Sequence, residues 1–189
     1  MSILIIGCLL FFGIHSVQIV CPNARQVVVL RHGERLWQLG YAIVAGIGLV
    51  LIVFGYGQAR QDAALLYAAP LWGRHAAMLL MLPVFPLLLA AYFPARIQHA
   101  VRHPMLIATC LWACAHLLAN GGLADAVLFG SFGGWAALDL LSFSWRPARA
   151  IRRFPARSYN DVIAVAAGLA LYGFFVLLGH RWVTGVPLS

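Results

Sequence analysis

Six long apolar segments constrain the fold of this chain more than any other feature. They cover residues 3–20, 39–57, 75–93, 104–118, 122–142 and 162–179 of the 189-residue sequence. A helix needs about 20 apolar residues to cross the hydrocarbon core of a bilayer, where the backbone must satisfy its own hydrogen bonds. We therefore predict an all-α fold, a polytopic transmembrane helical bundle with about six spans, forming a single domain over residues 1–189.

The composition excludes several other classes of protein. Hydrophobic residues make up 63% of the chain and charged residues only 10%, whereas a soluble domain is about half apolar and about a quarter charged. A disordered chain, a disulfide scaffold and an ordinary cytosolic enzyme are excluded. The first apolar segment begins at Ile3, with no basic residue before it and no A-x-A site after it, so we predict a retained span and no cleaved signal peptide.

The distribution of arginine predicts the orientation in the membrane. All 13 strongly basic residues are Arg, and with six spans ten of them lie in the first, third and fifth loops. Because cytoplasmic loops carry the excess of positive charge, we expect both termini outside the cytoplasm. The Arg-rich link from Trp145 to Tyr159 indicates an interfacial segment on an anionic leaflet. We predict the lipid bilayer as its partner, and no nucleic acid.

Two of the seven histidines, His15 and His116, lie well inside predicted spans, where an ionisable residue is a candidate for function. His15 lies about 18 Å below the outer edge of the hydrocarbon core, and His116 lies about 18 Å above its inner edge. In a core about 30 Å thick, their depths therefore differ by about 6 Å. Two imidazoles near one level could ligate a haem iron from opposite sides, with Phe11, Phe12 and Trp112 as apolar walls. Alternatively, each His donates one interhelical hydrogen bond.

Two further polar residues have candidate roles. Asn120 lies one helical turn after His116, on the same face, and could orient that imidazole or cap the turn. Asp139 lies near the inner end of the fifth span, where an acidic group needs a partner. We expect a structural ion pair with Arg102 or His103, which lie at the same level.

Small residues suggest packing positions within the bundle. Four glycines in and after the second span, Gly46, Gly48, Gly55 and Gly57, are predicted to allow close helix approach. The four cysteines are interpreted as small hydrophobic residues. The Cys110–Cys114 pair lies on one helical face, so redox or metal chemistry stays open for it, as do the roles of His75 and His103.

Three stretches of this sequence resemble a known family. They read GIHS at 13–16, RHPML at 102–106 and WACAHLLANG at 112–121. The resemblance is to NnrU proteins, bacterial membrane proteins associated with nitric-oxide and denitrification metabolism, and it covers roughly residues 3–145. The same superfamily includes the plant and cyanobacterial 15-cis-zeta-carotene isomerase. The resemblance implies a multi-pass protein of the bacterial inner membrane, with both termini periplasmic in the orientation predicted above.

The resemblance also implies a haem b cofactor. In the isomerase two His ligate the haem, and the reduced iron is active in a cis-to-trans change of a polyene. The matching positions here are His15 and His116. The plant isomerases have a Cys three residues before the second His, where this chain has Ala113. Its neighbour Cys114 is turned by about 100° around the helix, so a switch of ligand to that Cys is not expected.

Three arginines of the basic face, Arg31, Arg35 and Arg102, are the expected partners of the haem propionates. The implied function is a redox-linked or isomerase-like role on an apolar small molecule, such as a polyene, a quinone or a dissolved gas. One alternative is a sensing or assembly protein without turnover, because two axial His leave no open position on the iron. Another is a membrane methyltransferase, since the RHP triplet also opens a motif of isoprenylcysteine-type enzymes.

Overall fold

The computed structural model describes residues 1–147, 153–186 and 188, and the described residues form helices and no β-strand. Five helical segments among them are long and apolar enough to cross a membrane: Ser2–Val20, Glu34–Ala59, Gly73–Ala90, Leu123–Ser142 and Asn160–Thr184. A shorter apolar helix, Pro104–Ala119, corresponds to the fourth predicted span. The predicted all-α, polytopic fold is therefore confirmed.

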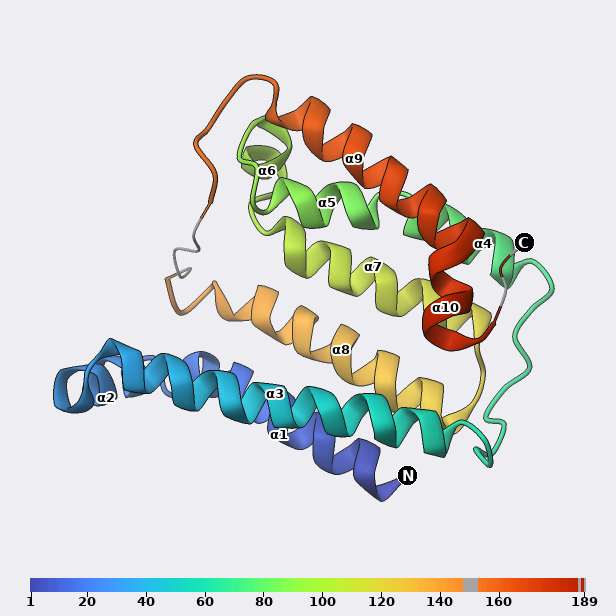
Figure 1. The fold of residues 1–189 in the computed structure, drawn as a ribbon, viewed down its shortest axis with the longest axis horizontal. Helices are drawn as coiled ribbons and strands as arrows, with labels where there is room; N and C mark the ends of the chain where they lie inside the picture. Colours follow the sequence, from blue (N-terminus) through green and yellow to red (C-terminus); the bar gives the residue numbers. More distant parts are fainter. Residues whose placement is uncertain (148–152, 187, 189) are drawn as a thin grey trace. The chain divides into compact units, whose positions relative to one another are not determined.

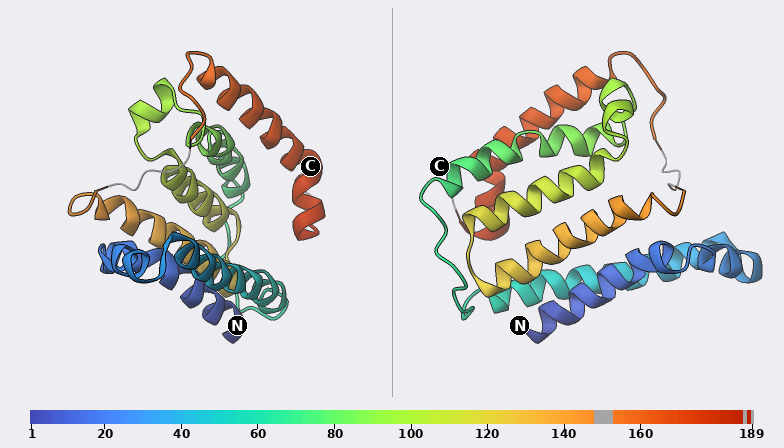
Figure 2. Two further views of the ribbon diagram at one scale, coloured as in Figure 1. Left: turned by 60° about the vertical axis from the view of Figure 1, so that its left-hand side comes forward. Right: turned by 180° about the vertical axis from the view of Figure 1, so that it is seen from behind.

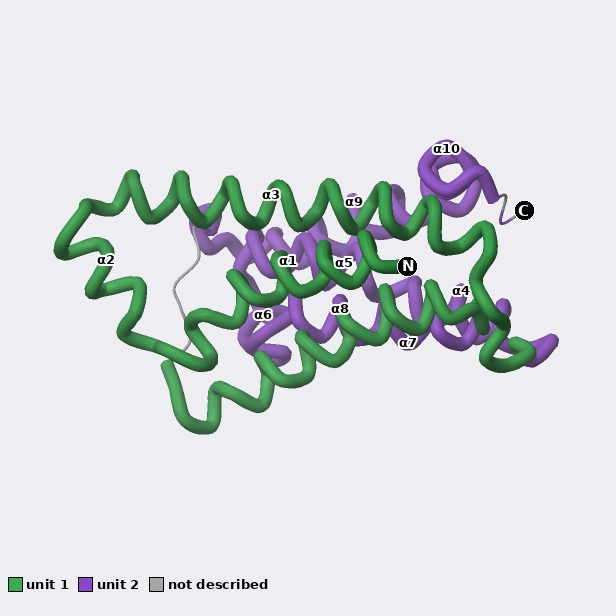
Figure 3. The backbone as a smooth tube through the Cα atoms, turned by 90° about the horizontal axis from the view of Figure 1, so that it is seen from below, with its two compact units in different colours: residues 1–69, 120–148 green, residues 70–119, 149–189 purple. Residues whose placement is uncertain are grey.

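The chain divides into two compact units. Unit 1 comprises residues 1–69 and 120–148, and unit 2 comprises residues 70–119 and 149–189 (Figure 3). Unit 1 contains α1 (Ser2–Val20), α2 (Ala24–His32), α3 (Glu34–Ala59) and α8 (Leu123–Ser142). Unit 2 contains α4 (Gly73–Met81), α5 (Val84–Ala90), α6 (Arg96–Val101), α7 (Pro104–Ala119), α9 (Asn160–Phe174), the π-helical η1 (Phe175–Gly179) and α10 (His180–Thr184).

In unit 1, the short helix α2 lies in the segment between the first and second predicted spans, where the sequence predicted only a loop. It has nine residues and is separated from α3 by Gly33, whose φ of 84° is readily adopted only by glycine. Arg25 of α2 donates to both carboxylate oxygens of Glu34, at 2.5 and 2.7 Å, and so ties α2 to the first turn of α3. As a result α3 begins five residues before the predicted start of the second span.

Glycine allows α1 and α3 to pack against each other along their lengths (Figure 1). A Cβ atom at Gly48 would lie 2.8 Å from the backbone nitrogen of Phe11, and one at Gly55 would collide with the backbone of Leu4. Gly48 and Gly55 are therefore close-packing positions, as predicted. The same prediction was wrong for Gly46 and Gly57, because nothing lies within 4 Å of a Cβ there. Seven residues are about two helical turns, so Gly48 and Gly55 share one face of α3, and Gly46 and Gly57 lie on roughly the opposite face.

Replacing Gly55 with alanine is expected to lower the free energy of unfolding by about 1–3 kcal/mol, the usual cost of overpacking. The new methyl group would meet the backbone of α1, which cannot rotate away as a side chain can. Gly57→Ala is the matched control, since its methyl group meets open space. Thermal unfolding in detergent, followed by circular dichroism, measures both variants. Equal stability of the two would contradict the close contact.

In unit 2, α5 lies along α9 and α4 lies along α7 (Figure 2). Helix α7 begins at Pro104, as predicted, with Arg102 and His103 directly before it. The third predicted span is broken between α4 and α5, at Leu82 and Pro83. Because proline lacks an N–H, it interrupts the helical hydrogen-bond ladder.

A tyrosine compensates for this break. The Leu82 N–H bonds to Leu79, at 3.3 Å, instead of to Met78 four residues earlier. The hydroxyl of Tyr172, on α9, donates to the carbonyl of Met78 at 3.0 Å. Backbone groups in a membrane must find partners within the protein, so Tyr172 makes the kink tolerable.

Candidate functional site

His15 lies half-buried in α1 among aromatic side chains from three helices of unit 1. Its ring stacks on Phe11, with 4.2 Å between ring centroids, and meets Tyr41 of α3 at 5.3 Å and Trp135 of α8 at 5.6 Å. Phe11, Phe12, Tyr41, Phe132 and Trp135 are called the aromatic cluster below. The surroundings of His15 are therefore apolar and aromatic.

The sequence identified only part of this cluster. Phe11 stacks on His15, and Phe12 contacts Phe11, Phe132 and Trp135. Their role as apolar walls of a haem pocket stays a prediction. Tyr41, Phe132 and Trp135 were missed because they come from α3 and α8, far away in the sequence. The spacing of Phe132 and Trp135, three residues apart on one helix face, is the signal that could have indicated them.

The hydrogen bond of His15 determines which of its nitrogens carries the proton. Its Nδ1 lies 2.6 Å from the carbonyl oxygen of Phe11, four residues earlier. A carbonyl only accepts, so Nδ1 donates, and in the neutral imidazole the lone pair is on Nε2. Metal-ligating histidines commonly show this arrangement, in which the second N–H is bound to a carbonyl.

His116 in α7 has the same arrangement. Its Nδ1 lies 2.9 Å from the carbonyl of Trp112, again four residues earlier, and the two rings are 5.1 Å apart. Trp112 therefore stands beside His116, and its role as an apolar wall of a haem pocket stays a prediction. In both histidines the Nδ1 bond stays within one helix. His15 belongs to unit 1 and His116 to unit 2.

An unsatisfied donor accompanies His15. The indole Nε1 of Trp135 is buried and has no hydrogen-bond partner among the described residues. A buried donor in an apolar medium costs free energy unless an acceptor reaches it. The chemistry around His15 thus fits a ligand that combines a flat apolar body with an oxygen acceptor, as a porphyrin with carboxylates does.

Asn120 belongs to a turn whose backbone is held by the preceding loop. Its carbonyl accepts from the hydroxyl of Tyr67 at 2.7 Å, and the carbonyl of Gly121 accepts from the N–H of Leu66 at 2.8 Å. These bonds agree with a role in the turn. Orientation of the His116 imidazole by Asn120 stays a prediction.

The predicted partner of Asp139 was wrong. Its carboxylate forms an ion pair with Arg146, not with Arg102 or His103. After α8 the chain makes a tight turn in which the Arg146 N–H bonds to Ser142, at 3.1 Å. Arg146 lies seven residues after Asp139, about two helical turns, and its side chain reaches back along the same face.

The predicted propionate partners Arg31, Arg35 and Arg102 are exposed.

Within each unit the arginines separate as the loop count predicts. One end of unit 1 carries Arg25, Arg31, Arg35 and Arg146, and the other carries Arg60. One end of unit 2 carries Arg96, Arg102, Arg153 and Arg157, and the other carries Arg74 and Arg181. Arg149 and Arg152 lie outside the described residues.

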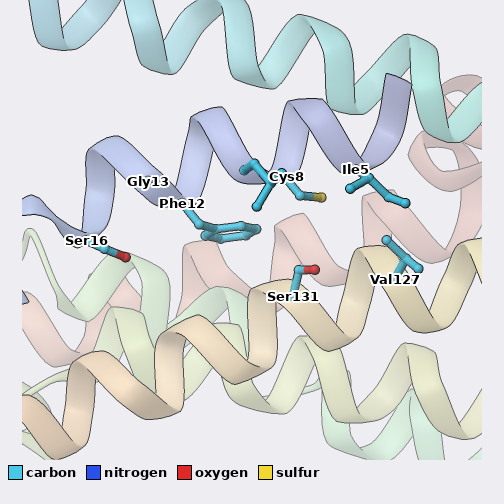
Figure 4. A pocket seen from close by; sticks show the side chains of 8 residues that line it. Ile5, Cys8, Phe12, Gly13, Ser16, Val127 and Ser131 are labelled. Atoms are coloured by element: carbon cyan, nitrogen blue, oxygen red, sulfur yellow. The ribbon is translucent and has the colours of Figure 1, made fainter. Parts of the chain in front are cut away.

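An open groove of about 310 Å³ runs between α1 and α8. Cys8 and Ser131 reach into it from opposite helices, and Ser16, the neighbour of His15, lines its other end (Figure 4). The rest of its lining is mostly apolar. Among the described residues, no group of three or more His, Cys, Asp or Glu lies together as metal ligands, and no disulfide joins the four cysteines.

Taken together, these features define a polytopic helical membrane protein. Each compact unit has, within a helix, a histidine whose Nδ1–H bonds to the carbonyl four residues earlier. The sequence matches the family model described as NnrU protein over residues 3–188, so the chain belongs to the NnrU family. The match includes the last span, which the resemblance over residues 3–145 had left out. No curated protein and no solved structure matches the chain at a significant level.

Proposed function

We propose that this NnrU protein binds haem b through His15 and His116. The observation that supports the proposal most is the hydrogen bond from Nδ1 of each histidine to its own helix, which leaves the lone pair on Nε2. A porphyrin supplies four nitrogen ligands itself, so two imidazoles complete the coordination. The aromatic cluster provides flat apolar contacts, and the buried Trp135 N–H provides a donor for an oxygen of the cofactor.

Bound haem would supply a redox-active iron within the bilayer, and the chain would supply ligation, burial and access. The mostly apolar groove between α1 and α8 would suit an apolar small molecule dissolved in the bilayer. We therefore favour a redox-linked or isomerase-like role on such a molecule. Arg31, Arg35 and Arg102 stay candidates for the haem carboxylates, because exposed guanidinium groups can bind them at the membrane surface.

An absorption spectrum of the protein purified in detergent tests this proposal. A Soret band with sharp α and β bands on reduction is expected. A colourless protein, after expression with ample haem, would contradict it.

A non-catalytic sensing or assembly role is the second candidate, because an iron held by both His15 and His116 would have no open position for a substrate. Carbon monoxide added to the reduced protein separates the two roles. Formation of an adduct would show that one axial position opens, as chemistry at the iron requires. An unchanged spectrum would favour the non-catalytic role.

We place the protein in the bacterial inner membrane with both termini in the periplasm, as the separation of arginines within each unit suggests. A reporter active only in the periplasm, fused after residue 189, is expected to give signal, and a cytoplasmic reporter at the same position is not. Cys21 lies exposed just after α1, on the predicted cytoplasmic side. An impermeant maleimide should therefore label it only after the cells are permeabilised. The reverse pattern in both assays would overturn the orientation.

A further inference from the structure

The face of α8 that contacts His15 continues into a charged pair. Trp135 meets the His15 ring, and Asp139 lies four residues later on the same face, about 6 Å further along the helix. Arg146 pairs with the Asp139 carboxylate, so a positive and a negative group lie together one helical turn beyond Trp135, the residue that contacts the histidine.

The pair is buried and held in place. The side chains of Arg146 and Asp139 are 6% and 14% exposed. Arg146 also donates through Nε to the Ser142 hydroxyl at 2.8 Å and lies over the ring of Phe143 at 4.5 Å. The Ser142 hydroxyl in turn donates to the backbone carbonyl of Asp139 at 2.6 Å.

Stability alone does not account for such a pair. The cost of removing two charges from water offsets most of their attraction, so hydrophobic residues of similar volume often serve as well. Charges at a low-dielectric site, in contrast, act strongly on any other charge nearby. Arg25 and Glu34 form another ion pair in the described part of unit 1. Their side chains are 32% and 39% exposed, so water weakens the effect of these charges on other groups.

We propose that Asp139 and Arg146 are positioning residues that set the reduction potential of the iron bound at His15. This inference rests on the proposed haem site. The carboxylate favours the oxidised iron, which carries one more positive charge, and the guanidinium favours the reduced iron. Each group therefore limits the effect of the other, and the potential depends on the intact pair.

Spectroelectrochemical titration of the haem-loaded protein tests this inference. Asp139→Asn is expected to raise the midpoint potential, because Arg146 is left alone, and Arg146→Gln is expected to lower it. The double variant should return toward the parent value. Opposite shifts distinguish an electrostatic role from simple loosening of the fold, which would move both single variants in the same direction. Glu34→Gln and Arg25→Gln are the matched controls and should leave the potential unchanged.

Arg146→Lys provides a measurement if Arg146→Gln does not fold. It keeps the charge, so the potential should stay at the parent value. Shifts of Asp139→Asn and Arg146→Gln in one direction, no shift in either, or a shift in Arg146→Lys would overturn the inference while the haem spectrum persists. A parent protein without haem, or a His15→Ala variant with an unchanged spectrum, would instead contradict the proposed function.

Discussion

Replacing His15 or His116 with alanine is expected to abolish or convert the haem spectrum of the purified protein. Each substitution removes one of the two imidazoles that are proposed to bind the iron through Nε2. Absorption spectra of the oxidised and reduced proteins measure the loss. Free imidazole added to the variant should restore part of the spectrum, because it can fill the space that the side chain leaves.

Two other histidines serve as controls. His99 is exposed on the short helix α6, and His180 is held near the other end of unit 2 by a bond of 2.7 Å from Nδ1 to Val186. His99→Ala and His180→Ala should keep the parent spectrum. If either control variant loses haem while His15→Ala or His116→Ala retains it, the ligand assignment is wrong.

Replacing Asp139 with asparagine is expected to lower the free energy of unfolding by about 3–5 kcal/mol, the usual loss when one partner of a buried ion pair is removed. Arg146 is 8% exposed as a residue, so its charge would stay buried without compensation. Chemical unfolding in detergent micelles measures the change.

Glu34→Gln removes a carboxylate of the same unit from a half-exposed pair and should cost only about 0–1 kcal/mol. The double variant Asp139→Asn with Arg146→Gln should recover part of the stability, since no unpaired charge remains. If Asp139→Asn and Glu34→Gln unfold alike, the Asp139 pair does not behave as a buried one.

Much of the architecture was predictable because it depends on local composition. A run of about 20 apolar residues has few alternatives to a membrane helix, and the segment 3–20 is found as α1, Ser2–Val20. The helix α7 starts at Pro104 because proline suits a first helical turn. Shorter elements were less accessible: α2 has only nine residues, and mixed apolar and basic residues fit a loop equally well.

The candidate site likewise has features that the sequence predicted and features that it did not. The depth of His15 and His116 follows from counting residues along a helix, and depth alone distinguished them from the other five histidines. The tautomer that each adopts depends on a bond to the carbonyl four residues earlier, which the sequence permits without requiring. Whether the two histidines share one haem is the part that the spectra of the alanine variants decide.

The positions of the apolar segments, the separation of arginines and the place of His15 and His116 along their helices follow from the sequence, because each depends on composition and on residue count. Which residues meet depends on the tertiary structure. Rotation of each helix about its axis selected Gly48 and Gly55, not Gly46 and Gly57, as contacts. The packing of α3 and α8 on α1 brought Tyr41 and Trp135 to His15. Contacts between distant segments depend on how whole helix surfaces fit together, and residue type at a single position carries little of that information.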